Sequence, residues 1–212
     1  YEISTRDWSS DVCSSDLVRG ENSTANGPYS SVSGSLTLAV PPSFYSISTT
    51  NVGAGGTNTV SLDVSGLTGY KHLQIRALLR TNSNSVIREA YVRFNNDTGL
   101  NYSFHRLYAQ GSSVTADASG PSDVWLPVAG GSGTQAGSNN FGAVILDILD
   151  FQNTNKYKTV RSFFGIDANS TGSMVFLASG FWRNTNAITT ITFNSGGQNQ
   201  QQYSQVSVYG IK

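Results

Sequence analysis

The chain of 212 residues is uncharged overall, because thirteen Lys and Arg balance thirteen Asp and Glu at neutral pH. With only 12% charged residues, it gives no basis for a nucleic-acid-binding or membrane-surface protein. One cysteine excludes a disulfide framework within the chain, and 22 glycines with ten Tyr and ten Phe are typical of a β-rich domain.

Residues 1–17 are predicted to be foreign to the protein. The segment DWSSDVCSSDL, Asp7–Leu17, fits no strand, helix or turn pattern, and its back-translation can be written as a common short-read sequencing adapter in one frame. Tyr1–Ile3 fit the end of the flanking primer. We therefore interpret residues 1–17 as translated adapter and exclude them from the fold prediction. They carry four of the thirteen acidic residues but only Arg6 of the basic ones, so the remainder has a net charge of +3, and Cys13 leaves with them. The true N-terminus is expected to be missing.

Residues 18–43, VRGENSTANGPYSSVSGSLTLAVPPS, are dominated by small polar residues and interrupted by Pro28, Pro41 and Pro42. This composition predicts a linker or weakly ordered arm. Residues 44–212 are long enough to form one domain with its own core.

The first half of this domain contains short alternating segments. Thr59–Val64 (TVSLDV) and His72–Arg80 (HLQIRALLR) place apolar residues at every second position, as half-buried strands require. Ile87–Asn95 (IREAYVRFN) is followed by the turn formers Asn96–Gly99 and by a second alternating segment, Leu100–Gln110 (LNYSFHRLYAQ). This arrangement predicts a hairpin.

The second half is more apolar. Phe141–Phe151 (FGAVILDILDF) is nearly continuous in apolar residues, which is typical of a strand covered on both faces or crossing the middle of a sandwich; it is too short to span a bilayer. KTVRSFFGIDA, SMVFLASGFWR, AITTITF and YSQVSVYGIK follow. Roughly ten strands without an amphipathic helix predict an all-β protein, an antiparallel two-sheet β-sandwich of jelly-roll type.

No motif in the chain predicts an enzyme. Gly131–Ala136 (GSGTQA) has the spacing of a nucleotide-binding glycine motif, but a polar loop follows it where a helix would be required. His72 and His105 are the only imidazoles, and strand alternation places His105 on one face with Ser103 and Leu107. A catalytic base would need a partner that the sequence does not supply. No catalytic, cofactor-binding or metal-binding residue is therefore predicted.

Asp147 and Asp150 could be paired carboxylates. Positions three apart on a strand face opposite sides, so the two carboxylates are not expected to converge on one ion or one scissile bond unless a bulge intervenes. A capping role or ion pairing with Lys156, Lys158 or Arg161 is expected instead.

Four sequence blocks carry a resemblance. They are VRFNNDTGLNYSFHRLYAQGSS, ILDILDFQNTNKYKTVRSFFG, SGFWRNTNAITTITF and the terminal SVYGIK. Over about residues 73–212, in this order, the chain resembles a family of bacteriophage virion structural proteins from environmental sequence. The resemblance implies a non-enzymatic protein of tail-fibre or capsid-decorating type. It also implies a location in the virion, assembly with other virion proteins and homo-oligomerisation, often as a trimer, with a host-surface glycan as a further partner.

The alternative is a carbohydrate-binding module of a secreted or cell-surface protein. Tyr102, Tyr108, Trp125 and Trp182 are its candidate sugar-binding residues, because aromatic rings stack on sugars. The competing interpretation places these rings in the core, Trp182 above all. A glycan-cleaving enzyme would need two converging carboxylates, and the sequence places no such pair.

Overall fold

The computed structural model describes residues 43–212, apart from the side chains of residues 121–122 and 128–129. The predictions for residues 1–17 and 18–42 lie outside this part. Within it, Ser43–Lys212 belong to one compact unit. The elements are β1 (Phe44–Asn51), β2 (Thr59–Asp63), β3 (His72–Leu79), β4 (Ile87–Phe94), β5 (Tyr102–Gln110), β6 (Ser113–Asp123), β7 (Leu126–Ser132), the 3-10 helix η1 (Thr134–Ala136), β8 (Gly142–Ile148), β9 (Lys158–Ile166), β10 (Met174–Trp182), β11 (Thr190–Asn194) and β12 (Gln205–Ile211).

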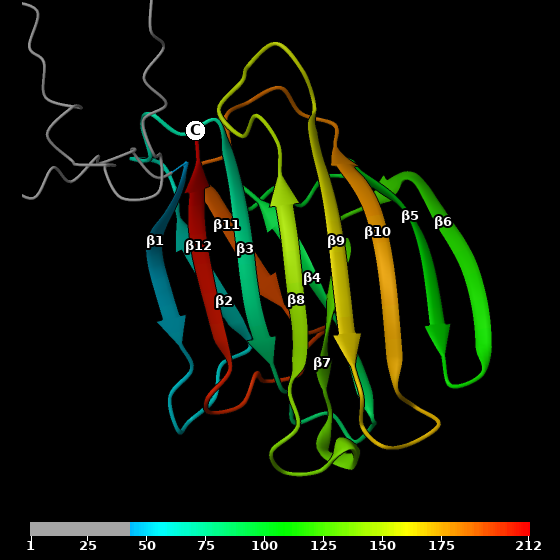
Figure 1. Ribbon diagram of the computed structural model, residues 1–212. Helices are drawn as coiled ribbons and strands as arrows, with labels where there is room; N and C mark the ends of the chain where they lie inside the picture. Colours follow the sequence, from blue (N-terminus) through cyan, green and yellow to red (C-terminus); the bar gives the residue numbers. More distant parts are fainter. Residues whose placement is uncertain (1–42) are drawn as a thin grey trace, which may run out of the picture. The chain divides into compact units, whose positions relative to one another are not determined.

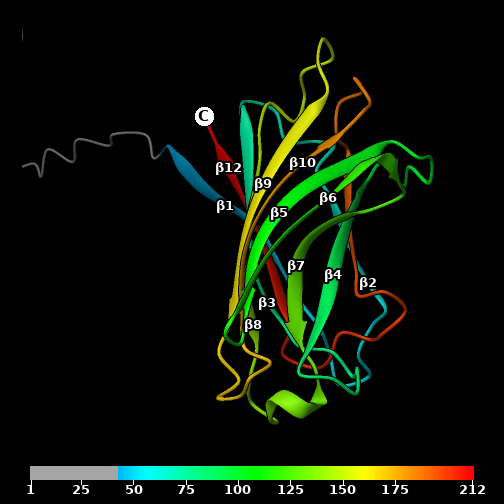
Figure 2. The same ribbon diagram turned by 90° about the vertical axis from the view of Figure 1, so that its right-hand side faces the viewer.

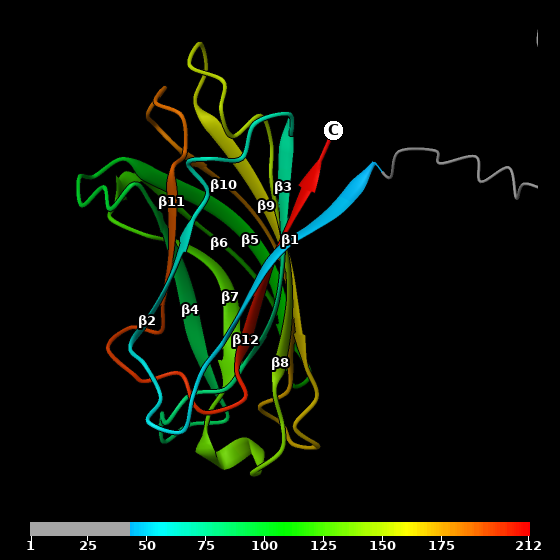
Figure 3. The same cartoon turned by 90° about the vertical axis from the view of Figure 1, so that its left-hand side faces the viewer.

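The strands form two antiparallel sheets packed face to face, which confirms the predicted sandwich (Figures 1 and 3). The larger sheet has the order β1-β12-β3-β8-β9-β10-β5-β6, and the smaller one β2-β11-β4-β7. Four antiparallel pairs, β1 with β12, β2 with β11, β3 with β8 and β4 with β7, are nested as in one long hairpin. Alternate pairs lie in opposite sheets, which is the wrapping of a jelly roll.

Two hairpins are inserted into this eight-stranded jelly roll. The β5–β6 hairpin comes between β4 and β7, and the β9–β10 hairpin comes between β8 and β11. Strand β9 pairs with β8, and β10 pairs with β5, so both insertions extend the same sheet. β5 and β6 curve over the smaller sheet beside β7 (Figure 2). The larger sheet therefore owes half of its strands to the insertions.

The predicted hairpin between Ile87–Asn95 and Leu100–Gln110 is wrong, because β4 and β5 belong to different sheets. Asn95 and Asn96 adopt left-handed φ angles of 51° and 54°, and the Asp97 carboxylate accepts the Gly99 N–H at 2.8 Å. These residues turn the chain from one sheet to the other. The turn formers do reverse the direction of the chain, but the local sequence does not specify which strands pair after the turn.

The core follows the alternation of the strands. On β3, Leu73, Ile75, Ala77 and Leu79 are all buried against the smaller sheet, as predicted. The same period-two burial continues through β9 and β10. Side chains at the intervening positions of these strands point to the outer surface of the larger sheet.

Trp182 and Asp97 join the two insertions at one end of the sandwich. Trp182, at the end of β10, donates its Nε1–H to Asp97 Oδ2 at 2.6 Å, and Asn101 donates to the same oxygen at 2.9 Å. The Tyr102 hydroxyl accepts the N–H of Phe94 at 3.1 Å. These contacts link the turn before β5 to the last residue of β10, which keeps the inserted strands in register.

Candidate functional site

The outer face of the larger sheet carries a block of apolar side chains. Its first row lies in register across β8, β9, β10, β5 and β6 and consists of Ile145, Phe163, Leu177, Leu107 and Ala116. Its second row, two residues further along each strand, consists of Ala143, Gly165, Val175, Ala109 and Val114. Leu78 of β3 extends the second row. We call these eleven residues the apolar block.

Most of the apolar block is exposed. Phe163 and Leu177 leave 48% and 56% of their surfaces accessible, and Val114 leaves 71%. Exposed apolar side chains normally occur singly on soluble proteins, and contiguous patches mark interaction surfaces. A block of two in-register rows across five strands is therefore the strongest functional feature of residues 43–212.

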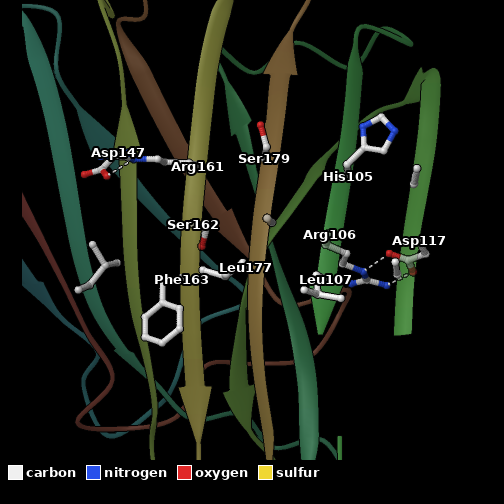
Figure 4. Close-up of a pocket in the computed structure, with 14 residues that line it drawn as sticks. His105, Arg106, Leu107, Asp117, Asp147, Arg161, Ser162, Phe163, Leu177 and Ser179 are labelled. Atoms are coloured by element: carbon white, nitrogen blue, oxygen red, sulfur yellow. Dashed lines mark hydrogen bonds and ion pairs between the residues drawn. The ribbon is translucent and has the colours of Figure 1, made fainter. Parts of the chain in front are cut away.

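The face is hollowed above this block. A depression of about 880 Å³ is lined from β5, β6, β8, β9 and β10, and Leu107, Phe163 and Leu177 point into it (Figure 4). A second depression of about 430 Å³ lies next to it over β3, β8, β9 and β12, and shares Ile145 and Phe163 with the first. Because the two hollows adjoin, the outer face is one shallow, continuous surface and not a deep pocket.

A polar row borders the apolar block on one side. In register it contains Asp147, Arg161, Ser179 and His105, from β8, β9, β10 and β5. Arg161 donates Nε–H to Asp147 Oδ2 at 2.8 Å, and Gln74 donates to Asp147 Oδ1 at 2.9 Å. The charges of this row are thus paired with each other. The block itself contains no charged residue, and Arg76 of β3 lies beside it, in register with Ile145, where it lines the second hollow.

On the opposite side of the β5–β6 hairpin, Arg106 holds the hairpin to the sandwich. It donates to Asp117 through Nε at 2.7 Å and through Nη2 at 2.9 Å, and it also pairs with Glu89 of β4. Tyr91 donates its hydroxyl to Glu89 at 2.8 Å. Burial, followed by the negative charge of Glu89, raises the pKa of Tyr91 to about 12. This network fixes the curvature of β5 and β6.

The predicted sugar-binding aromatics do not form a site. Tyr102 and Trp182 are 0% and 1% exposed and stack on each other inside the sandwich, so neither can present its ring to a glycan. The prediction is wrong for these two residues, because their polar atoms hydrogen-bond within the core. Trp125 is half-buried with the Arg93 guanidinium 3.5 Å above its ring, and Tyr108 packs against the core. The structure does not bring the four rings together on one surface.

The two aspartates lie as expected. Asp147 pairs with Arg161, while Asp150, beyond the end of β8, pairs with Lys156 and lies 3.6 Å from His72 Nδ1. Hydrogen bonding to Lys156 lowers the pKa of Asp150 despite the opposing effect of desolvation. The two carboxylates therefore have separate partners and do not converge.

Lys158 departs from the expected ion pairing. Its ammonium is buried and donates to the backbone carbonyls of Lys156 at 3.1 Å, Thr185 at 2.9 Å and Asn153. All three protons of the ammonium have acceptors, so Lys158 ties the β8–β9 loop to the loop after β10. Its role in the structure is to organise loops.

His105 lies on the outer face with Leu107, as strand alternation predicts, and lines the larger hollow. Among residues 43–212, no group of three or more His, Cys, Asp or Glu is arranged to hold a metal ion. No helix in this part of the chain is long and apolar enough to cross a membrane. In comparisons with known proteins, no family model, no curated protein and no solved structure matches the chain.

The predictions from sequence do not include the apolar block. The signal is present, because β8, β9 and β10 carry apolar residues on both faces, but for Phe141–Phe151 it predicted a strand covered on both faces or crossing the middle of a sandwich. In the structure Ala143 and Ile145 of β8 are exposed. An apolar run in a strand that no layer of the chain covers indicates a binding surface.

Proposed function

We propose that the chain is a non-enzymatic structural protein of a bacteriophage virion, of tail-fibre or capsid-decorating type, that acts by assembly with other proteins. The observation that carries this proposal is the apolar block on the outer face of the larger sheet. An apolar block without charge, built of Leu, Ile, Val and Phe with smaller Ala and Gly between them, favours a protein partner, because burial of such side chains drives association without any hydrogen-bonding requirement.

The architecture supports the same conclusion. Jelly rolls are used in viral capsid proteins and in lectins, so the fold is compatible with a virion role but does not decide it. The surface chemistry favours assembly. A lectin face offers polar groups that converge on a ligand, whereas two of the four members of the polar row here, Asp147 and Arg161, are already paired with each other.

The blocks that carry the family resemblance supply the contacts that hold the inserted hairpins. Asp97 belongs to the first block, Lys158 to the second and Trp182 to the third. These residues hydrogen-bond to one another or to the loops that flank β9 and β10. The resemblance therefore concerns the strands that build the outer face, which supports assembly as the function of that face.

A carbohydrate-binding module remains the second candidate, for one specific observation. Tyr157 is 51% exposed and stacks on Phe181 at a centroid distance of 6.2 Å. The pair lines a hollow of about 320 Å³ together with His105 and Ser179. An exposed ring beside hydroxyl and imidazole groups can stack on a sugar and hydrogen-bond to it.

Sequencing the source DNA across codons 17 and 18 and through the neighbouring genes tests the proposal. Neighbours that encode capsid, tail or packaging proteins, and detection of the chain by mass spectrometry in purified particles, are the expected results. Neighbouring genes for polysaccharide-processing enzymes would contradict a virion role. Binding on a glycan array that is lost in Tyr157→Ala would then favour the second candidate.

A further inference from the structure

The apolar block has relief that a flat hydrophobic patch would lack. Its first row is bulky, with Ile145, Phe163, Leu177 and Leu107 on neighbouring strands. Its second row carries small residues beside three of these bulky ones. On the same strand, Ala143 lies next to Ile145, Gly165 next to Phe163, and Ala109 next to Leu107. The face thus presents a ridge next to a trough over β8, β9 and β5. On β10 the trough carries Val175, and on β6 the order is reversed, with Ala116 in the first row and Val114 in the second.

The apolar block is large enough for the centre of a protein interface. Its eleven residues, on strands spaced about 4.8 Å apart and in rows about 6.8 Å apart, cover roughly 360 Å² in projection. The accessible surface of a ridged face exceeds its projection. A standard interface buries about 800 Å² on each partner, so the residues around the block would supply the remainder as a rim.

We propose that the apolar block binds the apolar block of a second copy of the chain, so that two larger sheets stack face to face in an isologous dimer. The proposal deepens the assembly function proposed above, and rests on it, by naming the partner. A matching partner must be uncharged, shallow and of the same extent, and it must offer a trough where this face has a ridge. The same face of a second copy meets all four conditions.

The pairing follows from a two-fold axis that lies between the sheets and runs across the strands, between the ridge and the trough. This axis places the ridge of each copy over the trough of the other, so Phe163 meets the partner copy's trough at Gly165, and Leu107 meets it at Ala109. Every contact is made twice, as two-fold symmetry requires. The twist of each sheet rotates the stacked strands by about 30° from strict alignment.

The arrangement leaves the polar row outside the apolar contact. Asp147 and Arg161 remain paired with each other at the rim, where each keeps its partner and access to water. The axis places Arg76, which is in register with Ile145 at the β3 edge of the face, over the partner copy's Leu78, where its exposed guanidinium can stay in water. The charges therefore stay at the edge of the contact, which limits the desolvation penalty that a buried charge would impose. An apolar centre and a polar rim are the usual composition of a protein interface.

Sedimentation equilibrium of the full chain, in reducing agent so that Cys13 cannot cross-link, tests the proposal. We expect a concentration-dependent dimer. Leu177→Asp places a carboxylate on the ridge and should weaken dimerisation roughly 30-fold or more, as for a central interface residue. The matched control is Leu100→Asp, because Leu100 is 58% exposed but lies in the turn before β5, and it should leave dimerisation unchanged.

Gly165→Val distinguishes ridge-in-trough packing from unspecific stickiness. A Cβ at Gly165 would meet no heavy atom within 4 Å, so valine fits the isolated chain and adds apolar surface. Unspecific association should therefore become stronger in this variant. In the proposed dimer, valine fills the trough that receives Phe163 and should weaken association about tenfold or more.

Each result decides the matter. A wild-type chain that stays monomeric at high micromolar concentration overturns the proposal, as does a dimer that Leu177→Asp and Leu100→Asp affect equally. Stronger association of Gly165→Val overturns the ridge-in-trough geometry. A monomer found in phage particles would refute the dimer and keep the virion function, whereas a dimer encoded among polysaccharide-processing genes would do the reverse.

Discussion

The hydrogen bond between Trp182 and Asp97 gives the most quantitative prediction. Trp182 is buried in contact with Phe94 and Tyr102, and its indole N–H donates to Asp97 Oδ2 at 2.6 Å. Trp182→Phe keeps an aromatic ring in the core but removes the donor and part of the ring system. Asp97→Asn keeps the size of the acceptor side chain but removes its charge.

The expected cost follows from these contacts. A hydrogen bond to a charged group contributes about 1.5–3 kcal/mol, and the smaller ring of Trp182→Phe adds about 1 kcal/mol of lost packing. Trp182→Phe should therefore lower the free energy of unfolding by about 2.5–4 kcal/mol. Since Asp97→Asn already removes the charged acceptor, the double variant should cost less than the sum, with a coupling energy of about 1.5–2 kcal/mol.

Equilibrium urea unfolding followed by far-UV circular dichroism measures the free energies of unfolding without relying on tryptophan fluorescence. Trp125→Phe is the matched control, because Trp125 is half-buried beneath Arg93 and makes its contact there through the ring face. It should cost about 1 kcal/mol or less. Equal destabilisation by the two tryptophan variants, or a coupling energy below about 0.5 kcal/mol, would refute the reasoning.

Three further predictions concern charged groups. Burial raises the pKa of Asp97, but hydrogen bonds from Trp182, Gly99 and Asn101 outweigh it and lower the pKa. The stability that ionised Asp97 contributes is therefore present above about pH 4 and is lost as the pH falls through the folded-state pKa. In urea titrations from pH 6 to 2, the difference in stability between the wild type and Asp97→Asn should shrink. Lys158→Met should lower the free energy of unfolding by about 3 kcal/mol, because three backbone carbonyls lose the buried ammonium that donates to them. Lys156→Met, at an exposed position, should cost less than about 1 kcal/mol, and similar values for both variants would contradict the role of Lys158. Arg106→Met should cost about 1–3 kcal/mol and increase protease cleavage in the β5–β6 hairpin, and unchanged cleavage would show that the ion pairs do not hold that hairpin.

The fold was predictable where local alternation decides it. His72–Leu79 and Ile87–Phe94 lie within one residue of the predicted segments, and the two-sheet architecture follows from the number of such strands. The partner of each strand was not predictable in the same way. Tyr102–Gln110 pairs with Met174–Trp182, about seventy residues further along, and nothing in the local turn sequence encodes that choice.

The strand Ser113–Asp123 was missed for a related reason. Its sequence, SVTADASGPSD, contains the turn formers Gly, Pro and Ser, and at the edge of the larger sheet it needs only one paired side. Edge strands tolerate proline and polar residues that a central strand excludes. Its place in the sheet comes from pairing with β5 and from the ion pair between Asp117 and Arg106.

The candidate site was hidden because its residues are ordinary in sequence and unusual only in position. Leu107 and Leu177 are seventy residues apart, and their alternation is that of any strand with apolar positions on both faces. Only the register, which places Leu107 opposite Leu177 and Leu177 opposite Phe163, turns scattered residues into a row. The aromatic residues that chemistry singles out, such as Trp182, serve the core instead.

The apolar block lies mostly on the inserted strands, and the core is wrapped by the other strands. The eight strands of the basic jelly roll wrap the core, and eight of the eleven residues of the block lie on the four inserted strands β5, β6, β9 and β10. Asp97, Trp182 and Lys158 hold these insertions from one end of the sheet, and Arg106 holds β5 and β6 from the inner side. A substitution that loosens an insertion should therefore weaken assembly at a distance from the block. Lys158→Met tests this, because Lys158 contributes no atom to the outer face. Reduced dimerisation at a temperature where the chain stays folded would show that the apolar block needs rigid insertions. Unchanged dimerisation would show that the block tolerates their movement.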